Sequence, residues 1–200
     1  ASAQPLFVKS GQGQRQEIDW DDHRMTGSDL YAMLTDKGEW TIFVVLGKGW
    51  DDDPVVNSGN FSNSRNILTA NPTTGYIGIC MLATSYGGFG GGIYNSGYKN
   101  TIPETAGKIS KGDPAIFALY SDSGGIKSRQ NGVDGTTGTA ADLVSTATTL
   151  QLGDIADNGL STEFYDGPLS EVLIFNGNLQ SYEMEQVEQY LSKRYDIGVR

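Results

Sequence analysis

The chain has little of several residues on which common chemistries depend. It contains one cysteine, Cys80, and one histidine, His23, among 200 residues. A lone cysteine cannot form an internal disulfide, and a thiol nucleophile needs a histidine beside it. Cys80 lies in the apolar run 76–83, where a buried, inert thiol is expected. With a single histidine, Ser-His-Asp catalysis and multi-histidine zinc sites are also disfavoured.

Long hydrophobic runs and basic clusters are missing as well. No stretch is long enough for a membrane-spanning helix, so we expect no membrane insertion. The net charge is −10 and the 14 Lys and Arg residues are scattered, which predicts no nucleic-acid partner. Residues 1–4 lack the pattern of a signal peptide, although export followed by cleavage stays open. A length of 200 residues suits one domain with a full core.

Short apolar runs and 27 glycines indicate an antiparallel β protein with many tight turns. Apolar residues occupy both alternating faces of the run Trp40–Leu46, so it predicts a central strand covered on both sides. Ser123-Gly124-Gly125 predicts a hairpin between strands 115–120 and 126–131, and Asn131-Gly132 predicts a second tight turn. Further strands are expected at 76–83, 148–152 and 169–175.

The C-terminal part predicts a strand followed by a helix. Alternation along 169–175 puts Leu169, Leu173 and Phe175 on one face with Glu171, which we interpret as a buried acceptor for loop amides. The segment Ser181–Tyr195 has an apolar stripe at helical spacing, glutamates early and Lys and Arg late. It predicts a helix that is capped by Ser181 and packs as a lid on the sheet.

This C-terminal block resembles the closing signature of laminin G-like, concanavalin A-like domains. The similarity lies in the run 166–176 (DGPLSEVLIFN), a short turn, and a helix ending in Tyr190-Leu191 and Tyr195. Segments 38–45 (GEWTIFVV), 130–133 (QNGV) and 150–153 (LQLG) are similar to earlier parts of that family. The resemblance implies an all-β, two-sheet antiparallel jelly-roll sandwich over residues 25–200 with one C-terminal helix, preceded by an N-terminal arm or edge segment, 1–24.

Domains with this ending are common in bacteriophage virion proteins and in bacterial surface or secreted proteins, often facing glycans. The resemblance therefore implies a non-catalytic structural or recognition module. Our main interpretation is a capsid decoration, fibre or tail-associated subunit on the virion surface, partnered by other virion subunits, by further copies of itself in a homo-oligomer, or by a host surface glycan. The alternative is a secreted or cell-surface bacterial carbohydrate-binding domain. A polysaccharide-degrading enzyme is the second alternative.

Two weak motifs bear on that enzymatic alternative. Segment 17–22 (EIDWDD) resembles the first half of a glucanase motif, but Asp22 stands where the acid-base glutamate belongs, and the shorter side chain would misplace a general acid. Segment 90–95 (GGGIYN) resembles a polysaccharide-lyase strand, with Arg129, Gln130 and His23 as conceivable partners. Neither motif is complete, so no catalytic residue is predicted.

Two groups of residues are candidates for binding. Acidic runs could supply hard oxygen ligands for calcium; their members are Asp51, Asp52, Asp53, Asp154 and Asp157. Solvation of these runs in an acidic protein is the competing interpretation. Aromatic faces stack on sugar rings while amides bind sugar hydroxyls; the candidates for a glycan or partner are Trp50, Tyr86, Phe89, Tyr94, Asn95 and Tyr98. The segment 86–98 reads as a glycine-rich loop, and its tyrosines could instead pack on the sandwich.

Overall fold

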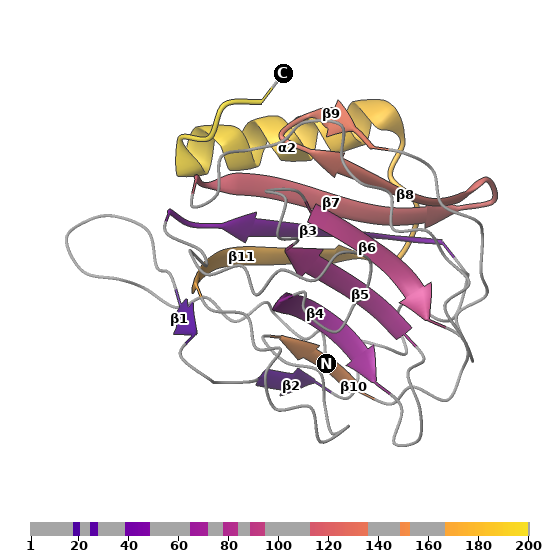
Figure 1. Cartoon of the computed structure of the whole chain (residues 1–200). Coiled ribbons are helices and arrows are strands. Elements are labelled where there is room, and N and C mark those ends of the chain that lie inside the picture. The colour runs from indigo at the N-terminus through magenta and orange to yellow at the C-terminus, as the bar shows by residue number, and fades with distance from the viewer. Residues whose placement is uncertain are drawn as a thin grey trace.

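Two antiparallel sheets and a C-terminal helix make up the fold (Figure 1). The structure, a computed structural model, describes residues 18–20, 25–27, 39–48, 65–71, 78–83, 89–94, 113–135, 149–152 and 167–199. Sheet A contains, in spatial order, β1 (Ile18–Trp20), β11 (Gly167–Phe175), β3 (Trp40–Leu46), β7 (Ala115–Asp122), β8 (Gly125–Gln130) and β9 (Val133–Asp134). Sheet B contains β2 (Met25–Gly27), β10 (Thr149–Leu152), β4 (Arg65–Asn71), β5 (Gly78–Ala83) and β6 (Phe89–Tyr94). The predicted all-β jelly-roll sandwich is confirmed.

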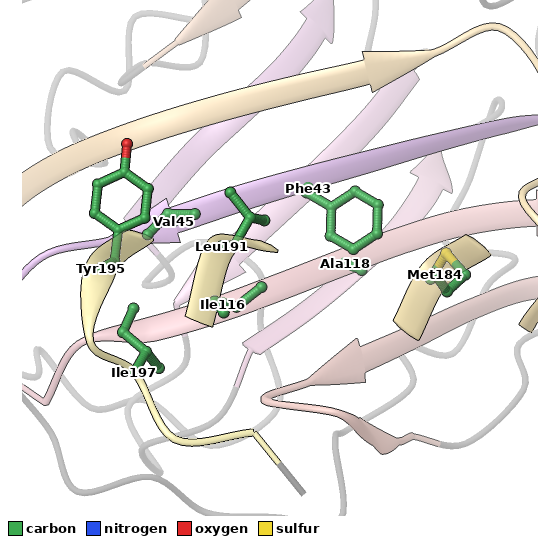
Figure 2. Close-up of a cluster of buried hydrophobic side chains, with 8 residues drawn as sticks. All are labelled: Phe43, Val45, Ile116, Ala118, Met184, Leu191, Tyr195 and Ile197. Atoms are coloured by element: carbon green, nitrogen blue, oxygen red, sulfur yellow. The ribbon is translucent and has the colours of Figure 1, made fainter. Parts of the chain in front are cut away.

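Strand β3 lies inside sheet A and is buried on both faces, as its sequence predicted. Each of its residues is at most 1% exposed. Phe43 and Val45 face helix α2 (Ser181–Tyr195), where they pack with Ile116 and Ala118 of β7 (Figure 2). By alternation Ile42 and Val44 occupy the other face of β3. β3 therefore contributes apolar side chains to both faces of sheet A, which explains its continuous apolar run.

Helix α2 covers the outer face of sheet A, which confirms the predicted lid. Met184, Leu191 and Tyr195 are buried against the cluster of Figure 2, and Ile197 beyond the helix completes it. The cap differs from the prediction. The N-cap is Gln180 rather than Ser181, because the extended Gln180 accepts the first helical hydrogen bond, from the Met184 N–H at 2.9 Å. The Glu183 carboxylate also accepts a hydrogen bond from the Gln180 backbone N–H at 2.8 Å. This is the returning half of a capping box.

A β-bulge in β11 changes the predicted faces of the closing strand. Leu169 pairs with Leu46, but Glu171 pairs with Val45, so Ser170 is an extra residue in the ladder. Paired residues share a face, and therefore Leu169 lies on the opposite face from Glu171. The prediction that they share a face was wrong, because simple alternation does not hold across a bulge. Leu173 and Phe175 follow the bulge and lie on the helix side, as predicted.

The two predicted turns are present in sheet A. Ser123 and Gly124 join β7 to β8, and the Asp122 carboxylate accepts a hydrogen bond from the Gly124 N–H at 2.7 Å. Asn131 (φ 49°) and Gly132 (φ 84°) join β8 to β9 with the positive φ values that a type I′ turn requires. The Asn131 side chain accepts a hydrogen bond from the Ile116 N–H at 2.8 Å, so this turn is tied to β7.

Segment 86–98 was predicted as a loop, but its central part is strand β6. Residues Phe89–Tyr94 (FGGGIY) pair antiparallel with Gly78–Ala83 of β5 along their whole length. Glycine has low strand propensity, but propensity is weak beside the gain from pairing with a neighbouring strand. The three consecutive glycines pair with Cys80, Met81 and Leu82.

Candidate functional site

The predicted glycan residues divide between the two ends of strand β6. β6 is an edge strand of sheet B, where the last described neighbour is β5. Phe89 begins β6 and pairs with Ala83, which in turn pairs with Arg65 at the start of β4. Tyr94 ends β6 and pairs with Gly78. The six-residue strand therefore separates Phe89 and Tyr94 by about 17 Å at 3.3 Å per residue.

Most of the other candidate residues belong to chain segments that enter or leave sheet B at its Phe89 end. The chain that carries Trp50 and the acidic run 51–53 enters β4 at Arg65, and Tyr86 belongs to the five residues between Ala83 and Phe89. The chain that carries Asp154 and Asp157 leaves β10 at Leu152, which pairs with Leu68 of β4. Asn95 and Tyr98 instead follow the Tyr94 end. The residues that lie outside the described ones are Trp50, Asp51, Asp52, Asp53, Tyr86, Asn95, Tyr98, Asp154 and Asp157.

Neither the calcium candidates nor the whole of the glucanase-like segment lies within the described residues. Among the described residues, no group of three His, Cys, Asp or Glu side chains could hold a metal ion. The calcium candidates all lie elsewhere in the chain, so calcium binding stays a prediction. Of the glucanase-like segment, Ile18–Trp20 forms edge strand β1, and Asp19 pairs with Pro168 of β11. In the described helices, none is long and apolar enough to cross a membrane.

Arg129, a conceivable lyase residue, is held in a buried ion pair instead. Its Nε and Nη2 donate to the two Glu188 carboxylate oxygens at 3.1 and 3.0 Å, and Nη1 donates to Asp134 at 2.9 Å. The side chains of Arg129 and Glu188 are 9% and 3% exposed. Burial acts to lower the pKa of Arg129, but the hydrogen bonds and charge of Glu188 raise it above its usual value. A guanidinium fixed in this way joins α2 to β8 and is unsuited to polarising a substrate.

The sequence analysis missed this pair, although a signal was present. Glu188 lies between Met184 and Leu191 on the apolar stripe of α2, where a charge has to be paired. A cation on the strand beneath was therefore to be expected, and β8 offers Lys127 and Arg129 on one face. Burial raises the pKa of Glu188, and Arg129 opposes that shift.

A second polar cluster lies where α2 ends against β11. Glu171 is buried, as predicted, but its donors are side chains of α2 rather than loop amides. The Tyr195 hydroxyl donates to Glu171 at 2.8 Å, and the Arg194 Nε lies 3.4 Å from the same carboxylate oxygen. Burial, together with the hydrogen bond to Glu171, raises the pKa of Tyr195 to about 12. A neutral tyrosine that donates to a carboxylate fastens the end of α2 to β11.

These described clusters thus serve the fold, and sheet B remains the candidate for recognition. No family model matches the chain, and no curated protein matches it. Solved structures show the same fold. The Ruminococcus gnavus IT-sialidase CBM40 bound to α2,3-sialyllactose has a TM-score of 0.64 and 14% identity, covering 93% of this chain and 97% of that one.

Two further structures widen the comparison. The NanB sialidase of Streptococcus pneumoniae (K499G mutant) has a TM-score of 0.62 and 14% identity; the match covers 84% of this chain but only 26% of the sialidase. The heptameric SAP-like pentraxin of Limulus polyphemus has a TM-score of 0.55 and 14% identity, covering 91% of this chain and 79% of its own. The chain thus has the jelly-roll fold of carbohydrate-binding modules and pentraxins.

Three of the matching structures are of one carbohydrate-binding domain, the Ruminococcus gnavus IT-sialidase CBM40, and none of the structures named above is a virion protein. The virion role therefore lacks support. Location, on a virion or secreted, stays a prediction.

Proposed function

We propose that this chain is a non-catalytic carbohydrate-binding domain that holds a glycan at the β6 side of sheet B. The observation that carries the proposal is the likeness over the whole length to a domain that is itself a binding module. The match covers 93% of this chain and 97% of the CBM40 domain that was solved with α2,3-sialyllactose. The likeness thus extends over a complete binding domain, whereas the match to the NanB sialidase covers only 26% of that enzyme.

Within sheet B, the Phe89 end is the favoured position for the glycan. Arg65, Ala83 and Phe89 form one row across β4, β5 and β6, and this row joins a guanidinium residue and an aromatic residue. The connection bearing Tyr86 begins and ends at this row, and the segment bearing Trp50 enters the sheet there. Aromatic faces for sugar rings and charged or amide groups for hydroxyls are the residue types that sugar recognition requires.

The test is a binding titration of the purified chain by calorimetry. The ligands are α2,3-sialyllactose, lactose and a panel of neutral oligosaccharides, each with calcium and with chelator. We expect saturable binding of at least one sugar. No binding to any of them under either condition would refute the proposed function, and binding lost in chelator would support the calcium prediction.

Alanine variants at the two ends of β6 then locate the site. Phe89→Ala should weaken binding at least tenfold, and Tyr94→Ala should have little effect if the Phe89 end binds. Tyr182→Ala is the matched control, because Tyr182 is exposed on α2, on the other side of sheet A. The reverse pattern would move the site to the Tyr94 end. If neither variant weakened sugar binding, the site would lie outside β6.

A further inference from the structure

The outer face of α2 carries two tyrosines that nothing described covers. Tyr182 is 62% exposed and Tyr190 is 49% exposed. Gln186, Gln189 and Lys193 are exposed on the same side of the helix, and the inner side is buried against sheet A. Positions 182, 186, 189 and 193 follow spacings of four, three and four residues, which is the seam along which two helices pack.

Charge along this outer face is divided by sign. Glu183 and Glu185 lie in the first half of the helix, and Lys193 and Arg194 lie in the last turn. A second copy of α2 laid antiparallel would bring each acidic half opposite a basic half, whereas a parallel copy would bring like charges together. The face is therefore complementary to itself in one orientation only.

We propose that the outer face of α2 binds a second copy of this chain in an antiparallel, two-fold symmetric pair. The two-fold axis would pass between Val187 and Glu188. This register brings Tyr182 against Lys193 of the second copy, which is a cation–π contact. It also brings Gln186 against Gln189, and symmetry repeats each contact.

The same register places Glu185 opposite Tyr190 of the second copy. Tyr190 is already ordered for this contact, because Arg194 lies 5.8 Å from its ring centre and donates to its hydroxyl oxygen at 2.6 Å. The hydroxyl hydrogen can then be donated to a glutamate. The Arg194 Nε lies 3.4 Å from a carboxylate oxygen of the buried Glu171, so Arg194 connects Tyr190 to β11.

The expected association is weak. A helix of 15 residues is about 22 Å long at 1.5 Å per residue, so a pairing confined to α2 buries less than the roughly 1,200 Å² of a stable interface. Each copy also carries a net charge of −10, which opposes approach at low salt. Measurements belong at about 0.15 M salt, where the Debye length is about 8 Å.

Sedimentation of the full chain over a range of concentrations is the first test. We expect reversible dimers, and a dissociation constant at least tenfold higher for Lys193→Glu, because the reversal acts twice in each dimer. Lys48→Glu is the matched control, since Lys48 is exposed after the end of β3 and is not part of α2. A wild-type chain that stays monomeric up to about 1 mM would overturn the proposal. So would a dimer whose dissociation constant changes equally in the two variants, or in neither.

Disulfide trapping tests the register. In a Cys80→Ser background, Tyr182→Cys and Lys193→Cys are prepared separately and mixed under mild oxidation. The antiparallel register predicts that the mixture forms a disulfide between the two different variants. Each variant alone should form little, because its two copies would lie about 16 Å apart along the axis at 1.5 Å per residue. Equal trapping within and between variants would overturn this register.

The interface does not depend on the proposed function. Lys193→Glu lies outside sheet B and should bind free sugar as the wild type does, so failure of one proposal is distinguishable from failure of the other. If the wild-type chain were monomeric and Tyr182→Ala abolished sugar binding, the α2 face would be a glycan site and the dimer proposal would be wrong.

Discussion

At the scale of single residues, the Arg129–Glu188 ion pair decides how firmly α2 is held on sheet A. Glu188→Gln would leave the Arg129 charge buried with only Asp134, itself exposed, as a charged partner. Removing one member of a buried pair costs about 3 kcal/mol. We expect that loss in the free energy of unfolding measured in urea.

The control for this variant is Glu185→Gln on the exposed side of the same helix. It should change the free energy of unfolding by less than about 0.5 kcal/mol. In the double variant Arg129→Met/Glu188→Leu both charges are removed, so its loss should be smaller than the sum of the single losses. Additive losses would mean that the two side chains do not depend on each other.

Tyr195 gives the fold a pH dependence at alkaline pH. Its pKa is about 12 in the folded chain against 10.0 for an ordinary tyrosine, so the folded state holds the proton more tightly. The stability from this group is complete below pH 10 and is lost as the pH rises from 10 towards 12. Urea unfolding at pH 9 and pH 11 should show a loss that is smaller in Tyr195→Phe. Tyr182→Phe is the control and should keep the full loss.

At the scale of elements, one hydroxyl holds the turn between β11 and α2. Thr41 of β3 donates to the Gly177 carbonyl and accepts from the Leu179 N–H, both at 3.1 Å, and it is fully buried. Thr41→Val keeps the shape but leaves both backbone groups without this partner. We expect a loss of about 2 kcal/mol and faster hydrogen exchange at Leu179. Thr41→Ser keeps the hydroxyl and should preserve the slow exchange.

Periodicity predicted the elements whose stability comes from burial. The range of β3 and that of α2 match the prediction, because each buries a regular apolar pattern. The bulge at Ser170 could not be predicted, since it arises from the register between β11 and β3, and alternation within β11 contains no trace of it. The same holds for β6, which exists because β5 offers a pairing edge.

The candidate site was predictable in residue type but not in arrangement. Composition singled out Phe89 and Tyr94 together, and the register with β5 puts them at opposite ends of one strand. The row from Arg65 to Phe89 was invisible in sequence, because its members are brought together by two separate strand pairings. Pairing between distant strands is decided by the whole sheet, and a local pattern does not contain it.

At the scale of the whole molecule, α2 and sheet B lie on opposite sides of sheet A (Figure 1). A second copy bound to α2 would therefore leave both sheets B accessible. Each dimer would present two copies of the proposed sugar site, turned away from the interface. Because the two sites face away from each other, such a pair can join two glycan-bearing partners rather than hold two glycans on one flat surface.

This arrangement predicts that the dimer cross-links polymers that carry many copies of the sugar. Light scattering should rise when the wild type is mixed with such a polymer at concentrations where dimers form, and it should not rise with Lys193→Glu. Calorimetry with free sugar should give equal affinities for the two proteins, because Lys193 lies on α2 and not in sheet B. A difference between the proteins with free sugar would mean that Lys193 acts on the sugar site itself.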